Sequence, residues 1–595
     1  MKSKIQERTV KPSYKPISIP TATAASSPIL QKSLKDINKG KMDLGELIAA
    51  AESLKATGDV ESSVALYSAW LSKTTSPLRY VALFNQAVGL AQLGRDVEAA
   101  TTYGAAVALK SDFPEARVNL GLTLEKQGHP KEALEQWKAV YDQPSTPVAM
   151  LTTALNHTGR LLEETREYEL AEQALTRSLA VNHNQPDALQ HWVHLRQKQC
   201  KWPVYSELPG ISKADMLLAT SPLAMLAEAD DPALQLLSAH VGLLLAELFE
   251  NQDRSQFETY GFCVSKEDGS AHRQRIIASL EHFERVGHLS DEQIARRILD
   301  CEIDILVDLN GLSSGTRVAV LGYRPAPVQA TWLGFIGTTA LPYIDFVIAD
   351  AFAIPEDLAS YYREKPLYLP HSFLPSDSRR EVGANTNRAA HHLPEDQFVF
   401  ASFNNIYKLN PRMFQTWMDI LLRVPNSVLW LLDDNRWATA NLTEFARSRG
   451  VDPKRLIFAG RIDPRDHLAR LPLADLFLDN HPYNAGSTAH DVLSKGLPML
   501  TLSGRTFVSR MGGSLLTALG LPELIAHSHE EYAEKAVQIA SILAQSSSHI
   551  IWNVYSSKQQ AAKSLKRPPN GLNRHQMSVR YLSEAGAISI TLILW

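Results

Sequence analysis

The apolar run VFASF is predicted to be a buried strand, and polar residues follow it closely. They are Asn404, Asn405 and, three positions further on, Lys408. Side-chain amides and an ammonium group are donors that suit a phosphate group. Exposed lysines and turn residues are also common in loops that bind nothing. This stretch therefore predicts a phosphate site only if a second element converges on it.

A helix predicted to begin near Ser487 is such an element, because the apolar run LADLFLD leads into it through a loop of small residues. The first turn of a helix offers unpaired amides and the positive end of a dipole to an anion. Ser487 and Thr488 add hydroxyl donors, and Asp491 is placed to accept from a ribose hydroxyl. Ser and Thr are also ordinary helix caps. A turn at the carboxyl end of a parallel strand favours the nucleotide interpretation.

A third stretch, RPAPVQATWLGFIGTT at 324–339, is an apolar strand-like run interrupted by Gly334 and Gly337. Glycine lets the backbone come close to another group. We expect these two glycines to let backbone amides approach a ligand.

The elements that must position these residues form two α/β units. The first contains RRILDCEIDILVDLNG, a helix followed by a buried strand, and the strand IDFVIAD. The second contains the runs FVFASF, SVLWLLDD, RLIFAG, LADLFLD and LPMLTL. Apolar strands that alternate with helices predict parallel sheets covered on both faces. Runs such as LWLL are therefore assigned to the core and to no chemistry.

A helical repeat precedes these units. Five positions recur after 34 residues, which is the tetratricopeptide period; they are Asn85, Leu90, Gly94, Ala99 and Tyr103, repeated as Asn119, Leu124, Gly128, Ala133 and Trp137. A small residue suits the helix contact, glycine the turn, and the aromatic residue the contact with the next repeat. Such an array performs no chemistry, but its concave face can hold an extended peptide.

Composition excludes several classes of protein. A net charge of −4 over 595 residues indicates no surface basic enough for nucleic acid. The three cysteines, Cys200, Cys263 and Cys301, are too widely spaced for a disulfide framework or a CxxC metal site. No apolar run is long enough to cross a bilayer, and the first residues lack the apolar core of a signal peptide. The sequence therefore predicts a cytoplasmic protein without nucleic-acid or membrane partners.

Five ordered blocks of this chain resemble glycosyltransferase family 41, the O-linked N-acetylglucosamine transferases and SPINDLY-like proteins. The blocks are RPAPVQATWLGFIGTT, FNNIYKLNP, RVPNSVLWLLDD, ADLFLDNHPYNAGSTAHDVLSKGLP and GRTFVSRMGGSLLTALGLPELI. The resemblance implies a GT-B fold, with two Rossmann-like domains after an all-α tetratricopeptide-repeat array. It also implies inverting, metal-independent transfer of a sugar from a nucleoside diphosphate to Ser or Thr hydroxyls, with no cofactor.

The resemblance assigns roles to individual residues. Lys408 matches the lysine on the diphosphate, where its charge would stabilise the leaving nucleotide, and Asn405 matches a neighbouring amide near phosphate. His467 matches the histidine that packs on uracil, and Arg470 the arginine beside the base. The remaining matches are Ser487 and Thr488 for phosphate and Asp491 for ribose. In the array, Asn85 and Asn119 resemble asparagines that grip acceptor backbone, although a structural asparagine fits the pattern equally well.

Two positions of the donor motif depart from the family. Gly486 stands where histidine is frequent, which removes one phosphate donor. Pro464 replaces a common lysine, and the neighbouring Arg465 could substitute for it. Both changes bear on which nucleotide is preferred more than on nucleotide binding.

A larger departure lies at the start of the catalytic region. Residues Pro232 to Glu250 read as one helix, where the family has a first Rossmann strand, a carboxylate-bearing turn and a histidine loop. His240 is what remains of the loop histidine and is the second catalytic candidate. Without the strand, neighbouring strands would keep unpaired backbone groups, which are costly to bury. From about Arg567 onward the sequence has no family pattern.

The function expected from the resemblance is transfer of N-acetylglucosamine from UDP-N-acetylglucosamine to proteins held by the array. Two alternatives stay open. One is a SPINDLY-type enzyme that uses GDP-fucose; the other is a catalytically impaired binding protein, which the shortened segment favours. A homo-oligomer also stays open.

The predicted organisation has five parts. They are a disordered tail (1–42), the repeat array and junction (43–205), an N-terminal catalytic domain shortened near 232–242 (206–385), a C-terminal nucleotide-binding domain (386–545), and a C-terminal segment atypical from about 567 (546–595).

Overall fold

The computed structural model divides the chain into two compact units, 1–192 with 208–211, and 193–207 with 212–595. It describes residues 27–220, 224–225, 227, 249–250, 254–255, 257–265, 267, 269–312, 316–377, 379–545 and 588–594. Among the helices of these residues, none has the length and apolar character that crossing a membrane requires.

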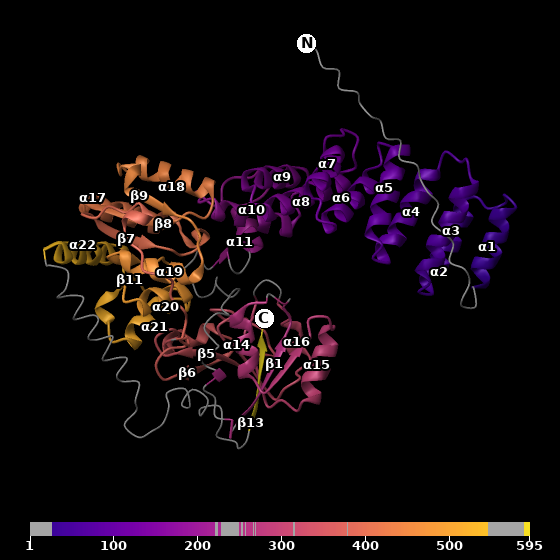
Figure 1. The fold of residues 1–595 in the computed structure, drawn as a ribbon. Helices are drawn as coiled ribbons and strands as arrows, with labels where there is room; N and C mark the ends of the chain where they lie inside the picture. The colour runs from indigo at the N-terminus through magenta and orange to yellow at the C-terminus, as the bar shows by residue number, and fades with distance from the viewer. Residues whose placement is uncertain are drawn as a thin grey trace, which may run out of the picture. The chain divides into compact units, whose positions relative to one another are not determined.

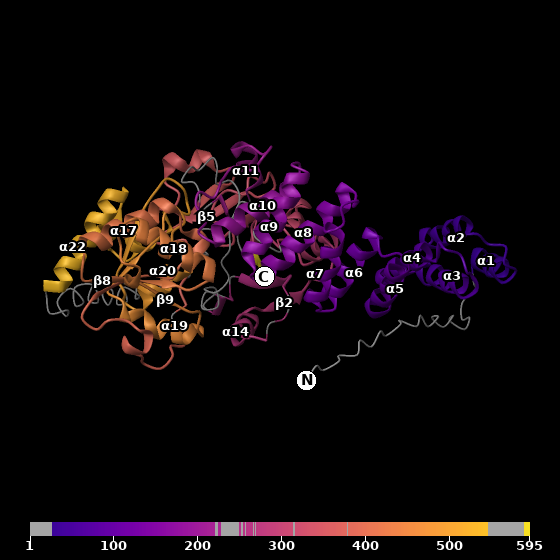
Figure 2. The same ribbon diagram turned by 90° about the horizontal axis from the view of Figure 1, so that it is seen from above.

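The first unit is a row of antiparallel helices, in which successive helices pack against each other (Figures 1 and 2). Their bounds are α1 Pro28–Asn38, α2 Leu44–Ala56, α3 Val60–Lys73, α4 Arg79–Gln92, α5 Asp96–Leu109, α6 Pro114–Lys126, α7 Pro130–Tyr141, α8 Val148–Glu164, α9 Tyr168–Val181 and α10 Pro186–Lys198. The last helix, α10, continues from residue 193 into the second unit. The turns after α2, α4 and α6 contain Gly58, Gly94 and Gly128, all at positive φ, a conformation open to glycine.

The packing explains the 34-residue period. Ala99 and Ala133 are completely buried at equivalent positions. A Cβ on Gly121 would lie 2.3 Å from Nε1 of the buried Trp137, whose indole also donates to the Val118 carbonyl at 3.2 Å. A small residue under a large aromatic one therefore packs the two helices of one repeat together, and the row of helices confirms the repeat array.

Helix α1 corrects the predicted extent of the disordered tail. Leu30, Leu34 and Ile37 have the spacing of one helix face and join the core that contains Trp70. The helix thus lies within the stretch predicted as tail. Residues 1–26 lie outside the described part of the chain.

The junction after the array corrects another expected boundary. The sequence analysis groups residues up to 205 with the array, whereas 193–207 belong to the second unit by their contacts. Cys200 is buried in the same core as Phe400 and Met413. The short helix α11, Lys213–Ala219, follows.

The second unit contains two sheets, here called the N lobe and the C lobe, and every strand pair in both is parallel. This confirms the predicted α/β class. The N-lobe order is β2-β1-β13-β3-β4-β5-β6. Its strands are β1 Phe257–Cys263, β2 His282–Arg285, β3 Ile305–Asp308, β4 Val328–Thr331, β5 Phe346–Asp350, β6 Lys365–Leu369 and β13 Ile588–Leu594. Its helices are α14 Ala271–Ser279, α15 Asp291–Asp300, α16 Ala319–Gly322 and the 3-10 helix η1 Glu356–Tyr361.

Strand β13 overturns the expectation that β1 and β3 keep unpaired backbone groups. Residues 588–594 pair with β1 on one side and with β3 on the other. In Figure 1 this yellow strand lies within the magenta sheet. Backbone groups in a central strand position require partners, and a segment from far along the chain provides them. The predicted helix at 232–250 lies largely outside the described residues.

The C-lobe sheet has the order β12-β11-β10-β7-β8-β9. Its strands are β7 Phe398–Ser402, β8 Ser427–Leu432, β9 Leu456–Ala459, β10 Leu476–Leu478, β11 Met499–Leu502 and β12 Ile525–Ala526. Its helices are α17 Pro411–Arg423, α18 Arg436–Ser448, α19 Pro464–Arg470, α20 Ser487–Ser494, α21 Met511–Ala518 and α22 His529–Gln545. The 3-10 helices after β6 are η2 Ala389–His391, η3 Ile406–Lys408, η4 Pro453–Arg455, η5 Leu471–Leu473 and η6 Pro522–Leu524.

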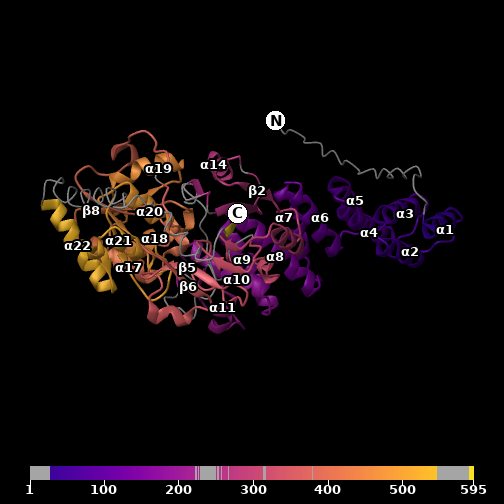
Figure 3. The ribbon, with the colours of Figure 1, turned by 90° about the horizontal axis from the view of Figure 1, so that it is seen from below.

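Side chains of the C-lobe strands alternate between two cores. Phe400, Leu429 and Leu476 lie in the core with α17, α18 and α22, and α17 packs beside α22 (Figure 3). The neighbouring residues Val399 and Phe477 lie in the core with α19, α20 and α21. Helices therefore cover both faces of the sheet, and the site must lie at the strand ends.

Candidate functional site

The candidate site lies at the carboxyl ends of β7 and β10. These strands are neighbours, and the chain leaves β7 towards one edge of the sheet and β10 towards the other. Open α/β sheets bind ligands at such a reversal of strand order. The loops after β7 and β10 carry Lys408 and Ser487, so the fold brings together the two stretches that the sequence analysis singled out.

Lys408 ends the 3-10 helix η3. Its Nζ lies 3.9 Å from the centre of the Tyr483 ring. Within the described part of the chain, no carboxylate forms an ion pair with it. Burial lowers the pKa of Lys408 to about 8, and the charge of Asp479 opposes that shift. Lys408 is half-buried, so its ammonium is partly desolvated and only partly compensated, a state that a phosphate anion would relieve.

Asp479 is a residue that the sequence analysis missed. It is completely buried one residue after β10. Its Oδ1 accepts from the backbone amides of Asn480 at 2.8 Å and Ala485 at 2.7 Å, and its Oδ2 accepts from Thr501 Oγ1 at 2.7 Å. Burial raises its pKa to about 6 despite these bonds. This carboxylate holds the loop before α20 in place, and an Asp directly after an apolar strand was the available signal.

Helix α20 begins where the sequence predicts, at Ser487. Its N-cap is Gly486, which provides no side-chain cap. Among the described residues, the hydroxyls of Ser487 and Thr488 have no hydrogen-bond partner. Both side chains are half-buried. The ordinary-cap interpretation therefore fails, and the first turn keeps its amides and two hydroxyls for an anion.

His467 and Arg470 form a unit on α19. Arg470 Nε donates to His467 Nδ1 at 3.1 Å, and the His467 ring meets Phe403 edge-on at 5.2 Å. Burial, followed by the charge of Arg470, lowers the pKa of His467 to about 4. Arg470 is only 2% exposed and also donates to the Gly460 carbonyl. Arg470 is therefore a buried residue that orients the neutral imidazole of His467.

Asn405 is exposed and is engaged by an arginine that the sequence analysis did not name. Arg461 donates to Asn405 Oδ1 at 2.7 Å and pairs with Asp434 at 2.7 Å. The neighbouring Asn404 is buried and donates to Asp479 Oδ1 at 3.2 Å. Asn404 thus belongs to the support of the site and Asn405 to its rim.

Asp491 forms an ion pair with Arg380, and its Oδ1 lies 3.6 Å from His490 Nδ1. His490 Nε2 is in turn 2.8 Å from Ser376 Oγ. Arg380 and Ser376 lie in the segment between β6 and β7, so this segment reaches the helix that carries the predicted phosphate and ribose ligands. Arg380 was also missed by the sequence analysis.

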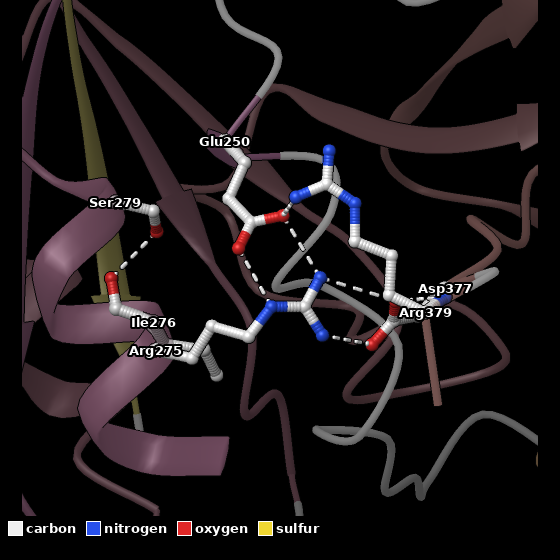
Figure 4. A network of polar contacts seen from close by, with 6 residues as sticks. All are labelled: Glu250, Arg275, Ile276, Ser279, Asp377 and Arg379. Carbon is white, nitrogen blue, oxygen red and sulfur yellow. Dashed lines mark hydrogen bonds and ion pairs between the residues drawn. The ribbon is translucent and has the colours of Figure 1, made fainter. Parts of the chain in front are cut away.

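The segment that carries Arg380 is anchored to the N lobe (Figure 4). Arg275 on α14 donates to Asp377 Oδ2 at 2.7 Å and to Glu250 at 2.6 and 2.8 Å, and Arg379 donates to Glu250 at 3.0 Å. The Asp377 side chain is completely buried. These pairs hold the segment immediately before Arg380.

Gly334 of the glycine-rich stretch does not act as predicted, whereas the prediction for Gly337 stays untested. A Cβ on Gly334 would lie 2.2 Å from the Leu309 carbonyl oxygen, so the glycine is needed for contact between two loops of the N lobe. Thr338 and Thr339 donate to the buried Glu364. Close approach here is to protein backbone, which is the physical reason for this correction.

The sequence analysis names three further candidates, His240, Asn85 and Asn119. His240 lies outside the described residues. In the array, Asn119 Nδ2 lies 3.4 Å from Tyr103 Oη, and Asn85 lowers a Tyr67 pKa that burial raises to about 12. Both asparagines are half-buried against tyrosines of the preceding helix, which supports the structural interpretation of these positions.

Comparison with known proteins decides the family. The profile of glycosyltransferase family 41 matches residues 239–384 and 382–562, more than half of the 595 residues, and a tetratricopeptide-repeat profile matches 90–128. The chain belongs to glycosyltransferase family 41. Among curated members of the family, the probable UDP-N-acetylglucosamine–peptide N-acetylglucosaminyltransferase SEC of Arabidopsis thaliana is 38% identical over 304 residues. That alignment covers 50% of this chain and 31% of the relative.

Two further curated relatives match about half of this chain. The Caenorhabditis elegans UDP-N-acetylglucosamine–peptide N-acetylglucosaminyltransferase is 26% identical over 49% of this chain and 35% of the relative. The Arabidopsis protein named SPINDLY is 33% identical over 47% of this chain and 31% of the relative. The chain thus spans about a third of the length of these curated relatives.

A solved structure agrees in fold. A mutant of the O-GlcNAc transferase of Thermobaculum terrenum matches 94% of this chain and all of its own, at 20% identity and a TM-score of 0.51. This match supports a GT-B arrangement after a helical array.

Proposed function

We propose that this family 41 chain transfers N-acetylglucosamine from UDP-N-acetylglucosamine to Ser or Thr hydroxyls of proteins. The proposal rests on one observation. A desolvated Lys408 and the uncapped first turn of α20 lie at the reversal point of the same sheet. Both are suited to a diphosphate.

The reaction assigns a task to each group. The acceptor oxygen forms a bond to the anomeric carbon while the bond from that carbon to the diphosphate oxygen breaks, with inversion. The electron pair and the negative charge leave with UDP. Lys408 and the first turn of α20 stabilise that charge, which grows in the transition state. His467 would pack on the base and Asp491 would accept from ribose. His240 is proposed to take the hydroxyl proton.

The acceptor is proposed to lie along the repeat array. Tetratricopeptide arrays present extended surfaces that bind peptide. Asn85 and Asn119 remain candidates for the acceptor backbone, although both already contact tyrosines of the array. They therefore need a test separate from that of Lys408.

Nucleotide release from UDP-N-acetylglucosamine, with and without acceptor proteins, tests the proposal. We expect release to rise with acceptor and to fall about 100- to 1,000-fold in Lys408→Ala, as when one stabilising donor of a transition state is removed. Lys454→Ala, an exposed lysine of the same lobe, is the matched control and should behave as wild type. UDP binding, measured by calorimetry, separates loss of affinity from loss of turnover.

The remaining outcomes discriminate the alternatives. Release from GDP-fucose but not from UDP-N-acetylglucosamine would assign the SPINDLY-type donor. The wild-type chain could also fold and bind UDP but release no nucleotide from either donor. That outcome would contradict an active enzyme and favour a binding protein.

A further inference from the structure

The N-lobe sheet has a slot between β1 and β3 that residues 588–594 occupy. β1 pairs with β13 from Phe257↔Ile588 to Cys263↔Leu594, and β13 pairs with β3 from Ile590↔Ile305 to Ile593↔Asp308. β1 and β3 do not pair with each other anywhere in the described sheet. The backbone pairing between the two halves of the described sheet therefore passes through β13.

The sequence of this segment fits that position. ISITLIL contains no charged residue, and four of its seven residues are β-branched Ile or Thr, counted as Ile588, Ile590, Thr591 and Ile593. Such residues favour strands, and near-continuous apolar character is typical of a parallel strand with helices on both faces. The described N lobe has an apolar core on each face of its sheet, one around Phe335 and one around Ile298.

The position of the slot in the strand order makes an unoccupied slot costly. With β13 counted as the first strand, the N-lobe order follows the same doubly wound pattern as the C lobe. The slot therefore lies at the reversal point, beside the end of β3. There, Asp308 accepts from the amides of Asn310 at 3.0 Å and Gly311 at 2.8 Å. An empty slot would leave facing amides and carbonyls of two strands without partners.

We propose that the slot between β1 and β3 is a strand-acceptor site, and that residues 588–594 of the same chain are its occupant. The segment lies beyond residue 562, where the family match ends. The N lobe is thus built from two separate pieces of chain and depends on a segment that the family pattern does not contain. This inference concerns assembly of the lobe and does not depend on the proposed function.

A disulfide trap tests the register in the full-length chain. Leu594 is the register partner of Cys263, and partners on neighbouring strands have Cα separations that a disulfide can span. In a Cys301→Ser background, we expect Leu594→Cys to form an intramolecular disulfide with Cys263 under mild oxidation. The matched control, Ile593→Cys, lies opposite Phe262 and should remain reduced, because neighbouring positions alternate between the two faces.

Electrophoresis without reductant distinguishes the sources of the strand. A faster-migrating monomer supports the proposal when mass spectrometry finds the disulfide-linked peptides that contain positions 263 and 594. A disulfide-linked dimer overturns it, because the slot would then hold the segment of a second copy. No disulfide at position 594, or equal trapping at position 593, also overturns it.

Hydrogen exchange provides a test that needs no new cysteine. Proline cannot donate to a ladder and is excluded from central strands. We expect Thr591→Pro to increase amide exchange in both β1 and β3 by tenfold or more, while β7 and β8 of the C lobe keep wild-type rates. Ser578→Pro, outside the strand, is the control and should change neither. Unchanged protection of β1 and β3 in Thr591→Pro would overturn the proposal.

Discussion

At the residue scale, burial works against the charge of Lys408. Its pKa of about 8 lies below the ordinary lysine value because desolvation disfavours the ammonium. Asp479 supplies a compensating charge but has its own pKa raised to about 6. Both groups cost folding energy in their charged forms, which is typical of sites that bind a charged ligand.

The first prediction concerns the pH profile of Lys408. We expect kcat/KM to fall as pH rises through about 8, because the free enzyme then loses the ammonium. The same lysine should make the free energy of unfolding rise as pH increases from about 8 to about 10. In that range the unfolded chain still binds a proton on this lysine that the folded chain has lost. Rate profiles and urea unfolding at matched pH values measure both effects.

Lys408→Arg is the control for that profile. Arginine keeps its charge far above pH 8, so the alkaline fall should disappear while the absolute rate is lower. An alkaline fall that persists unchanged in Lys408→Arg would assign it to another group.

The second prediction concerns His467. Its pKa of about 4 keeps the imidazole neutral, so its contribution to UDP affinity should not vary between pH 5 and pH 8. We expect His467→Ala to lose about 1 to 3 kcal/mol of binding if the ring stacks on the base, and His467→Phe to retain most of it. Calorimetry across this pH range measures the effect. Equal losses in both variants would refute stacking.

At the scale of elements, the array depends on glycines that have different roles. Gly121 lies against Trp137, whereas nothing lies within 4 Å of a Cβ placed on Gly104 of α5. These positions allow a matched pair of identical substitutions.

The third prediction uses that pair. Gly121→Ala should destabilise the array by about 1 to 3 kcal/mol, because the rigid indole cannot move away without disturbing the core. Gly104→Ala should stabilise it by about 0.5 to 1 kcal/mol, because alanine favours a helix interior. Urea unfolding followed by far-ultraviolet circular dichroism measures both. The packing argument fails if the two substitutions have the same sign.

The elements also separate what the sequence could predict from what it could not. The strands around FVFASF and LADLFLD and the start of α20 at Ser487 were predictable, because apolar runs, small-residue loops and their order are local signals. Arg380 and β13 were not predictable, since their roles arise from partners far away along the chain. Gly334 was misassigned for a related reason: a glycine signals close approach but not what approaches.

At the scale of the whole catalytic unit, the segment between the lobes is held by charge. Arg275 lowers the pKa of Glu250, and Arg379 adds to that effect. Asp377, whose side chain is completely buried, accepts from the other N–H edge of the Arg275 guanidinium. The network of Figure 4 therefore connects α14 to the residues next to Arg380.

The fourth prediction tests that connection. Arg275→Ala should destabilise the N lobe by about 1 to 3 kcal/mol at pH 7, because a buried carboxylate loses its charged partner. The difference from wild type should shrink as pH falls below about 4, where the lowered pKa of Glu250 no longer contributes. Arg296→Ala, an exposed arginine on α15, is the control. Urea midpoints at the two pH values measure the difference.

Strand β13 has a consequence for how the protein is made. Domains of a growing chain generally fold in the order in which they leave the ribosome. Here β1 and β3 emerge early, but the strand between them is translated after the whole C lobe. The C lobe can thus fold first. The central hydrogen bonds of the N lobe can form only after residues 588–594 have been synthesised. For this chain, synthesis and assembly of the catalytic unit run in opposite directions.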